Sequence, residues 1–431
     1  MISPEGASEI AESRQHGDPE CVAALPRFLH TADWQIGKPF RNITDPQKRF
    51  RLQQQRILSV SRIAAVADEH NVDAVLVAGD LFDSSTVPSA VVMEVLEVIG
   101  SMNRPVLVIP GNHDHGGAGG VWQRQDVQRQ LKERAPLMQL LLKPEPVLID
   151  HALVLPCPLL RQRDSEDPSA WISQLDWQDL AEDCPRIVLA HGAVHGFEST
   201  DYNQDSAGQS ERINRIDLDM IQHGQVDYIA LGDWHNLKQV GDRAWYCGTP
   251  EPDRFDQGDQ DQRGQVLVFD IDRGTCPIPK SVSTAGLHWH NLRVQLRTTS
   301  DLDRLERTLQ QRIGSRVGRD LLRLEINGQL SLREYQRFDA LIEVLRTQLL
   351  HVRIKGTCHR RPGQEELRAM TDRSEDHLIS SIALQLQGEL ENLEPIKSLT
   401  SEQQSEAELI ELALCELHRL CSESFLSLIH I

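Results

Sequence analysis

Between residues 26 and 275, short apolar runs alternate with segments whose apolar residues recur at helical spacing. Several of the runs are apolar at nearly every position, which is typical of strands that are buried on both faces. The runs that we interpret as strands are PRFLHTAD, VDAVLVAGD, RPVLVIPGNHD, PVLID, ALVLPCPLL, PRIVLAHG, VDYIALGDWH, AWYCGTPE and GQVLVFDID. Helices are predicted for residues 47–70, 88–101 and 127–142. This alternation of strands and helices predicts a layered α/β domain.

Residues 287–360 have a different pattern, which predicts a smaller α+β unit. A strand-like run, LHWHNLRVQL, is followed by a helical segment, DLDRLERTLQQRI. The next strand-like run, DLLRLEING, is expected to end in an Asn-Gly turn, because this dipeptide favours tight turns. A helix that starts at Ser331 and a final strand, HVRIKGT, complete the unit.

Two amphipathic helices are predicted after the break RRPGQEE, in residues 364–431. Their apolar stripes consist of Ile379, Ile382, Leu386, Leu390 and Leu393 in the first helix and of Ile410, Leu414, Leu417, Cys421 and Phe425 in the second. The segment SEAE at residues 405–408 has the pattern of a capping box and predicts the start of the second helix. Such stripes either pack on their own domain or form a hairpin that docks on the helices of a partner, and both alternatives stay open.

The composition is that of a globular protein, because 39% of the 431 residues are hydrophobic and 25% are charged. No apolar run approaches the roughly 20 residues of a membrane-spanning helix. The first 25 residues are polar and acidic, without the apolar core of a secretory signal, and we interpret residues 1–25 as a flexible extension. The eight cysteines are scattered without a C-x-x-C pair, so we expect reduced thiols, a cytoplasmic location and no contact with a membrane.

The net charge of −19, taken alone, argues against a nucleic-acid-binding protein, because such proteins usually carry a basic field. The charge is, however, unevenly distributed along the chain. Residues 285–361 contain 15 Lys and Arg against 8 Asp and Glu, a net charge of +7, whereas residues 362–431 contain 4 against 14, a net charge of −10. A basic block therefore lies between an acidic body and an acidic tail, unless the difference is a chance fluctuation on a solvated surface.

Polar residues with metal-binding groups follow the predicted strands at the points where the strands end. They are Asp33 with Gln35, Asp80, the segment Asn112 to His115, His191, and Asp233 with His235. Ligands of open α/β sheets bind at the edge where the carboxyl ends of the strands meet. Any one of these residues alone is best interpreted as a surface residue, but the ordered set is hard to assemble by chance. Carboxylate, amide and imidazole groups together suit a pair of divalent cations such as Mn²⁺.

These motifs resemble the calcineurin-like metallophosphoesterase superfamily and, more narrowly, the SbcD-type DNA repair exonucleases. The motifs that match in order and spacing are HTADWQIG, VAGDLFDS, PGNHD, LAHG, YIALGDWH and YCGTPEPDRF. The resemblance covers residues 27–275 closely and the smaller α+β unit more loosely. It implies an α/β/β/α sandwich with nuclease activity at residues 26–280, a basic cap that contacts DNA at 285–361, and partner-docking helices at 364–431.

The resemblance also implies a centre of two divalent metal ions, with Mn²⁺ preferred over Mg²⁺. One ion would be held by Asp33, Gln35, Asp80 and His235, and the other by Asp80, Asn112, His191 and Asp233. Asp80 would bridge the ions, because one carboxylate can hold two cations that are about 3.5–4 Å apart. His113 would face the scissile phosphate and stabilise or protonate the leaving oxygen. Asp114 would hold the imidazole of His113 in the required tautomer.

Two positions depart from the family pattern, which usually has Asp-x-His at the first motif and Gly-His-x-His at the last. Gln35 and Asp233 stand where the family has imidazoles. An amide and a carboxylate thus replace two nitrogen ligands, and this favours Mn²⁺ or Mg²⁺ over Zn²⁺. The neutral amide of Gln35 is the weaker substitute. Because random decay would more often leave Ala, Leu or Ser, we interpret the site as altered and not as inactive.

The preferred hypothesis is a Mn²⁺-dependent nuclease that hydrolyses phosphodiester bonds of duplex ends or single strands in double-strand-break repair. The resemblance implies an SbcC-type coiled-coil ATPase as its partner, since this chain contains no Walker motif, and it implies a homodimer. Two alternatives stay open. The chain could be a phosphodiesterase for a small substrate, or a scaffold that binds DNA ends and retains a vestigial metal site.

Overall fold

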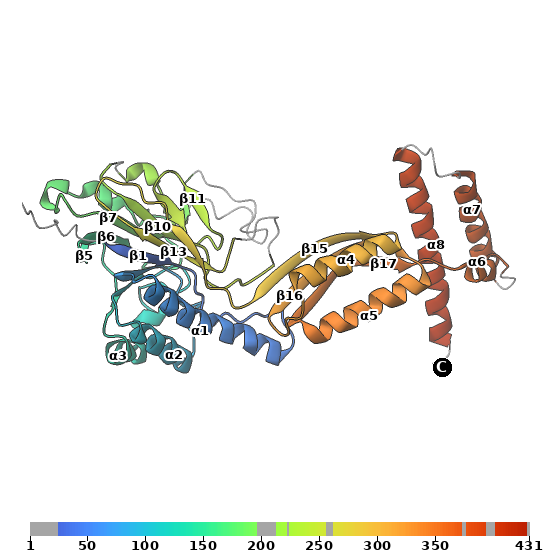
Figure 1. Ribbon diagram of the computed structural model, residues 1–431, viewed down its shortest axis with the longest axis horizontal. Helices are drawn as coiled ribbons and strands as arrows, with labels where there is room; N and C mark the ends of the chain where they lie inside the picture. The colour runs from blue at the N-terminus through green and yellow to red at the C-terminus, as the bar shows by residue number, and fades with distance from the viewer. Residues whose placement is uncertain are drawn as a thin grey trace, which may run out of the picture. The chain divides into compact units, whose positions relative to one another are not determined.

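The computed structural model describes residues 25–195, 213–221, 224–255, 262–372, 376–393 and 401–428. The chain forms two compact units, and each unit is assembled from separate stretches of sequence (Figure 1). The first unit consists of residues 1–37, 60–248 and 265–283, and the second consists of residues 38–59, 249–264 and 284–431. The helix α1 (Pro46–Glu69) contributes its beginning to the second unit and the remainder to the first.

The first unit is built on two six-stranded sheets. In spatial order, the first sheet contains β14 (Lys280–Ser283), β13 (Gln265–Asp270), β1 (Arg27–Thr31), β2 (Ala74–Ala78), β3 (Val106–Ile109) and β4 (Met138–Leu140). The second contains β11 (Lys238–Val240), β12 (Ala244–Tyr246), β10 (Tyr228–Gly232), β7 (Arg186–His191), β6 (Ala152–Cys157) and β5 (Val147–Ile149). The strands β1 to β4 are parallel neighbours, and so are β6, β7, β10 and β12. A short separate pair joins β8 (Ala193–Val194) and β9 (Arg215–Ile216).

The main core of the first unit lies between the two sheets. Phe28, Leu76 and Leu107 of the first sheet and Val154 and Leu189 of the second belong to one buried cluster. Figure 1 shows the helices α1, α2 (Ser89–Ser101) and α3 (Gln125–Arg134) together on one side of the strands. The predicted strands are buried on both faces because both faces are covered, and the predicted α/β/β/α class is confirmed.

The outer layer over the second sheet differs from the simple expectation. Among the described residues it contains the 3₁₀ helices η2 (Ala170–Gln174), η3 (Trp177–Asp179) and η5 (Leu218–Met220). Ile172, Trp177 and Leu218 of these segments pack in one cluster with Leu155 and Val188 of the sheet. A further 3₁₀ helix, η1 (Val121–Gln123), lies between β3 and α3.

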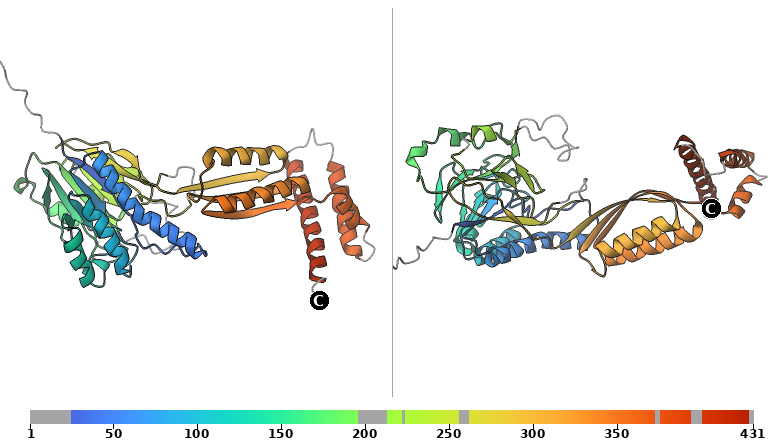
Figure 2. Two further views of the ribbon diagram at one scale, coloured as in Figure 1. Left: turned by 60° about the horizontal axis from the view of Figure 1, so that its bottom comes forward. Right: turned by 45° about the horizontal axis from the view of Figure 1, so that its top comes forward.

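The second unit contains a three-stranded parallel sheet in the order β15 (His288–Leu296), β16 (Asp320–Leu330) and β17 (His351–Arg360). The helices α4 (Thr299–Arg312) and α5 (Leu332–Gln348) connect the strands and cover one face of this sheet (Figure 2). Both helices begin with a capping box, formed by Thr298 with Asp301 and by Ser331 with Glu334. The predicted helix start at Ser331 is therefore confirmed.

Three further helices follow, α6 (Gln364–Thr371), α7 (His377–Leu393) and α8 (Ser401–Leu428). Part of the predicted stripes packs inside this unit, since Ile379 and Leu417 join the buried Met370, Ala383 and Cys421. The helix α8 also pairs with the end of β17, where Glu416 lies 3.1 Å from Nδ1 of His359. Among the helices that the structure describes, none combines the length and the apolar composition that a membrane span requires.

Three local predictions are wrong. The helix predicted for residues 127–142 ends at Arg134, because Ala135 precedes Pro136 and a residue before proline disfavours the helical conformation. The Asn327-Gly328 dipeptide does not form a turn, and β16 continues through it to Leu330. The segment SEAE lies inside α8, which already begins at Ser401. The helix α6 was not predicted from the break RRPGQEE.

The imidazole of His30 is fully buried between the two sheets of the first unit. Its Nε2 lies 3.2 Å from the carbonyl oxygen of Leu231, and its Nδ1 lies 3.1 Å from the hydroxyl of Tyr228. Since a carbonyl oxygen can only accept, Nε2 carries the proton and Nδ1 accepts from Tyr228. Burial lowers the pKa of His30 from 6.5 to about 3, although the Leu231 carbonyl opposes this shift.

We therefore expect His30 to make folding stability depend on pH. Between pH 6.5 and about 3 the unfolded chain binds a proton that the folded chain does not bind, so the contribution is complete above pH 6.5 and is lost as the pH falls. Chemical denaturation should show that a His30→Gln variant loses about 2 kcal/mol less than the wild type between pH 6.5 and pH 5. The exposed His377→Gln variant should follow the wild type, and equal pH profiles for all three proteins would contradict the assignment.

Candidate metal centre

The carboxyl ends of five parallel strands bring the predicted residues together in the first unit. Asp33 and Asp80 each follow a strand of the first sheet by two residues, after β1 and β2, and Asn112 follows β3. His191 is the last residue of β7, and Asp233 comes directly after β10 in the second sheet. The two sheets are tied together at this edge, because the backbone N–H of Asp233 donates to Asp33 Oδ1 over 3.1 Å.

A buried group of three side chains lies at the centre of the site. One carboxylate oxygen each of Asp33 and Asp80 and one ring nitrogen of His191 all lie within 4.8 Å of one another. Asn112 and Asp233 adjoin this group through His191, whose Nε2 is 3.2 Å from Asn112 Oδ1 and 3.8 Å from Asp233 Oδ1. His235 is also buried but lies outside the group of three. The group contains one residue from each predicted ligand set together with Asp80, which both sets share.

The tautomer of His191 leaves a lone pair that points at oxygen atoms. Its Nδ1 lies 2.7 Å from the carbonyl oxygen of Ala78, which can only accept, so Nδ1 carries the proton. Burial lowers the pKa of His191, and the ring is therefore neutral with an unprotonated Nε2. This nitrogen faces Asp80 Oδ1 at 3.6 Å in addition to the oxygens of Asn112 and Asp233. Acceptors that face one another in this way are stabilised by a cation between them, so the donor set fits a metal ion.

The carboxyl groups of the site are costly to bury in their charged forms. Burial raises the pKa of Asp80, although the charge of His113 opposes the shift. Burial also raises the pKa of Asp233, and the charge of Asp80 adds to this effect. A divalent cation would reverse this balance, because its charge favours the deprotonated form of every carboxyl group around it.

The backbone of the site adopts conformations that L residues rarely adopt. The φ angles are +54° at Asp33, +42° at Gln35, +55° at Asp80 and +100° at Asp233. Each such conformation costs about 1–3 kcal/mol and persists only where the surrounding structure holds it. These four residues aim their side chains at one place from the ends of three strands, so the strain coincides with the site.

Two glycines allow the side chains of the site to approach the backbone closely. A Cβ atom on Gly79 would lie 2.3 Å from Nδ1 of His191, and a Cβ atom on Gly111 would lie 2.2 Å from Oδ1 of Asp80. Both distances are far below van der Waals contact, and Gly79 also has a φ of +84°. The glycines in VAGD and PGN are therefore parts of the site that sequence reasoning treated only as its flanks.

Gln35 is buried beside Asp80 and contacts it twice. Its backbone N–H donates to the carbonyl of Asp80 over 2.8 Å, and its side chain forms a hydrogen bond with the Asp80 carboxylate that lowers the pKa of this group. The amide nitrogen must be the donor in the second contact, because an ionised carboxylate only accepts. The structure thus brings Gln35 next to the central carboxylate, with its amide nitrogen facing that group.

The arrangement around His113 differs from the prediction for Asp114. Nδ1 of His113 lies 2.9 Å from the carbonyl oxygen of Asp83, so this carbonyl holds the imidazole in one tautomer. The carboxylate of Asp114 is fully buried and accepts backbone N–H groups instead, from Gly111 over 2.7 Å and from Leu81 over 2.9 Å. Burial and the charge of Asp80 raise the pKa of Asp114 to about 7. Asp114 therefore fixes the loop that carries Asp80, and the predicted contact with the His113 ring is replaced by the Asp83 carbonyl.

Comparison with known proteins assigns this site to a family. Residues 26–237 match the calcineurin-like phosphoesterases, and the chain therefore contains a domain of the calcineurin-like phosphoesterase family. The matched region contains all the residues of the group described above and both sheets that carry them.

Among individual proteins, the chain is similar to nuclease subunits of DNA repair complexes. It is 26% identical over 277 residues to SbcD of the SbcCD nuclease of Escherichia coli K12, which covers 56% of this chain and 65% of that protein. It is 27% identical over 258 residues to the DNA double-strand break repair protein Mre11 of Haloferax volcanii, which covers 57% of this chain and 49% of that protein. SbcD of Bacillus subtilis is 32% identical over 93 residues, or 21% of this chain and 22% of that protein. The chain thus spans less than two thirds of the length of these relatives.

The close approach of Gly111 predicts that a methyl group at this position displaces the Asp80 carboxylate. We expect a Gly111→Ala variant to bind Mn²⁺ roughly 10- to 100-fold more weakly in a calorimetric titration, which is the usual effect of disturbing the groups that orient a ligand. Gly388→Ala in α7 is the matched control, since nothing lies within 4 Å of the added atom. This control should keep the Mn²⁺ affinity of the wild type. An unchanged affinity in the Gly111→Ala variant would show that Asp80 is not a ligand held by this contact.

The position of Gln35 predicts the outcome of restoring the imidazole of the family pattern. A Gln35→His variant should retain or raise the affinity for Mn²⁺, because an imidazole nitrogen is a better ligand than a neutral amide oxygen and no longer donates to Asp80. Metal content after dialysis, measured by mass spectrometry, checks this. A clear loss of bound Mn²⁺ relative to the wild type would mean that the amide is specifically required.

Proposed function

We propose that this chain is a metal-dependent DNA nuclease that hydrolyses phosphodiester bonds at a centre of two divalent ions, with Mn²⁺ preferred over Mg²⁺. The observation that carries the proposal is the unprotonated Nε2 of His191, which faces the oxygens of Asp80, Asn112 and Asp233. Together with Asp33, these groups supply the nitrogen and oxygen ligands that such cations bind. The phosphoesterase family supports hydrolysis of a phosphate ester, and the similar nuclease subunits support DNA as the substrate.

The residues divide into two proposed ligand sets that share Asp80. One set is Asp33, Gln35, Asp80 and His235, and the other is Asp80, Asn112, His191 and Asp233. When bound, two divalent ions would polarise the phosphodiester and lower the pKa of a water molecule that attacks it. The buried carboxylates Asp33 and Asp80 orient this centre because backbone contacts hold both residues, and the site excludes bulk water from them.

We assign to His113 the proton transfer to the leaving oxygen. Its side chain is 41% exposed, in contrast to the buried ligands, and it is therefore accessible to a substrate. The Asp83 carbonyl accepts from Nδ1, which leaves Nε2 as the ring nitrogen that can hold or release a proton toward the substrate. Nε2 lies 4.0 Å from Asp80 Oδ2, so the donor would stand beside the bridging carboxylate.

We further propose an SbcC-type coiled-coil ATPase as a partner of the helices α7 and α8. The similar proteins are named as parts of the SbcCD nuclease, which supports a second component. Exposed leucines support a helical contact, since Leu378, Leu384 and Leu409 are 69%, 56% and 67% exposed although other residues of their helices are buried. A homodimer and a cytoplasmic location stay expectations from the resemblance.

The proposal predicts that His113→Ala abolishes catalysis without removing the metal ions. We expect cleavage of labelled duplex and single-stranded DNA in Mn²⁺ to fall by about 10²–10⁴-fold, which is the usual contribution of a positioned acid or base. His195→Ala is the matched control, because His195 is an exposed residue just after β8 and belongs to neither ligand set.

Metal content and a second substrate separate the alternatives. Two Mn²⁺ per chain in the wild type and in His113→Ala support the assignment, whereas normal cleavage by His113→Ala contradicts it. Hydrolysis of bis(p-nitrophenyl) phosphate without any cleavage of DNA would identify a small-substrate phosphodiesterase. A wild-type protein that retains no Mn²⁺ but binds DNA ends would instead be the scaffold.

A further inference from the structure

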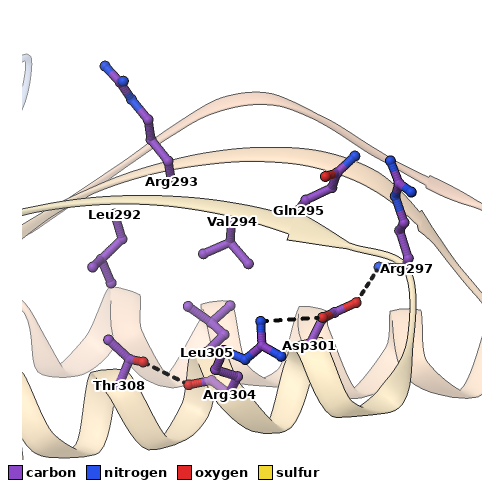
Figure 3. Close-up of a pocket in the computed structure, with 9 residues that line it drawn as sticks. All are labelled: Leu292, Arg293, Val294, Gln295, Arg297, Asp301, Arg304, Leu305 and Thr308. Atoms are coloured by element: carbon purple, nitrogen blue, oxygen red, sulfur yellow. Dashed lines mark hydrogen bonds and ion pairs between the residues drawn. The ribbon is translucent and has the colours of Figure 1, made fainter. Parts of the chain in front are cut away.

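The parallel sheet of the second unit has two faces of different character. Leu292, Leu324 and Ile354 point toward the helices and pack with Leu305 and Phe338. Because successive side chains of a strand point to opposite faces, the odd-numbered residues of β15, β16 and β17 project from the other face. Figure 3 shows this for β15, where Leu292 and Val294 point toward α4, whereas Arg293 and Gln295 stand on the opposite side. The figure thus separates a helix-covered face from an uncovered one.

We define the open face as nine residues that form three rows across the strands. The rows are Asn291, Arg323 and Arg353, then Arg293, Glu325 and Lys355, and then Gln295, Asn327 and Thr357. None of the nine is buried. Neighbouring strands lie about 4.8 Å apart and successive rows about 6.6 Å apart, so the cations form a regular two-dimensional array.

The positive charge of this unit is concentrated on the open face. The helices α4 and α5 each contain three Arg against three Asp or Glu. Several of these arginines are paired, as Arg337 is with Asp303 at 2.7 Å and Arg346 with Glu343 at 2.7 Å. The open face has four cations against one carboxylate, and the helix side therefore has no net charge whereas the open face is positive.

The one carboxylate of the open face holds three of its cations in place. Glu325 lies 2.8 Å from Nε of Arg293 and 3.9 Å from Nζ of Lys355, and it also contacts Arg323. The Arg323 and Arg293 contacts lower the pKa of Glu325, so it is ionised at neutral pH. Arg293 and Lys355 keep side-chain exposures of 68% and 44%. The cluster is therefore preorganised and still accessible, with two positive charges in excess.

The far end of the same sheet face already binds anionic groups within the molecule. Arg361 lies 3.3 Å from Glu411 of α8, and Nδ1 of His359 lies 3.1 Å from Glu416 of the same helix. These residues have the odd-numbered positions that follow the three rows of the open face. The carboxylates of α8 thus cover one end of the basic surface and leave the three rows uncovered.

We propose that the open face binds the phosphate backbone of duplex DNA without reading its bases. The array presents arginine and lysine donors, which suit the repeating charge of a phosphodiester chain. Its nine residues include no aromatic side chain, so it lacks the stacking platforms on which single-stranded nucleic acids are usually bound. The choice of DNA over an acidic protein rests on the proposed function, and the assignment of the face rests on its own contacts.

A binding experiment in EDTA tests the face independently of the metal centre. The variant replaces Arg293, Arg353 and Lys355 by Gln, and the matched control replaces Arg307, Arg312 and Arg346 of α4 and α5 by Gln, with the same loss of charge. Fluorescence anisotropy with a labelled duplex of about 30 base pairs is measured between about 50 and 200 mM NaCl. We expect the slope of log affinity against log salt to decrease by up to about 2.7 in the face variant, since each lost phosphate contact removes about 0.9.

Each result has a defined meaning. Affinity at about 150 mM NaCl that falls at least roughly tenfold in the face variant, with little change in the control and an unchanged thermal unfolding curve, supports the proposal. An equal loss in both variants, or an unchanged slope in the face variant, overturns it and leaves an acidic protein surface as the partner of this face. Cleavage of DNA in Mn²⁺ is measured separately. A protein that binds DNA through the face but does not cleave it therefore contradicts only the proposed nuclease.

Discussion

The structure of the first unit depends on the convergence of buried carboxylates with the lone pair of a neutral imidazole. Asp33, Asp80 and His191 have their polar atoms within 4.8 Å of one another and are almost completely removed from water. Burial works against the charge of Asp80 and against a proton on His191. Such a group is stable only when a cation or a set of N–H donors compensates it, and the chain supplies part of the donors from its own backbone.

Several features of the fold follow from this requirement. The parallel strands of both sheets end at the same edge, and this brings together residues that are up to 200 positions apart in the sequence. Gly79 and Gly111 leave the space that the close contacts need, and the positive φ angles direct four side chains inward. Asp114 is also buried, and it stabilises the turn behind Asp80 by accepting backbone N–H groups. His113, on the other hand, stays partly exposed, so the molecule separates groups that are positioned for metal ions from a group that can reach a substrate.

The sequence allowed the location of the site to be predicted, but not the contacts inside it. Apolar strands followed by Asp33, Asp80, His191 and Asp233 reveal the site because parallel strands place their carboxyl ends on one edge, and this rule needs no side-chain geometry. The partner of the His113 ring depends on which atom lies closest after folding, and the carbonyl of Asp83 has no signature in the sequence. Gly328 misled the prediction for a related reason. It completes a dipeptide that is typical of turns, yet a Cβ atom there would lie 1.9 Å from the carbonyl oxygen of Leu296, so the glycine serves strand packing.

The discontinuous composition of the units has a consequence for how this protein is made. The strand β1 pairs with β13 over residues that include Arg27 and Asp270, so a central strand of the first sheet gains its neighbour only after most of the unit has been translated. Residues 38–59 leave the ribosome early but belong to the second unit, whose other parts begin at residue 249. A single truncation between the units would therefore remove part of one and isolate a segment of the other. Separate expression of either unit would need at least two junctions, and early chains on the ribosome must keep apolar strands unpaired for long enough to depend on protection from aggregation.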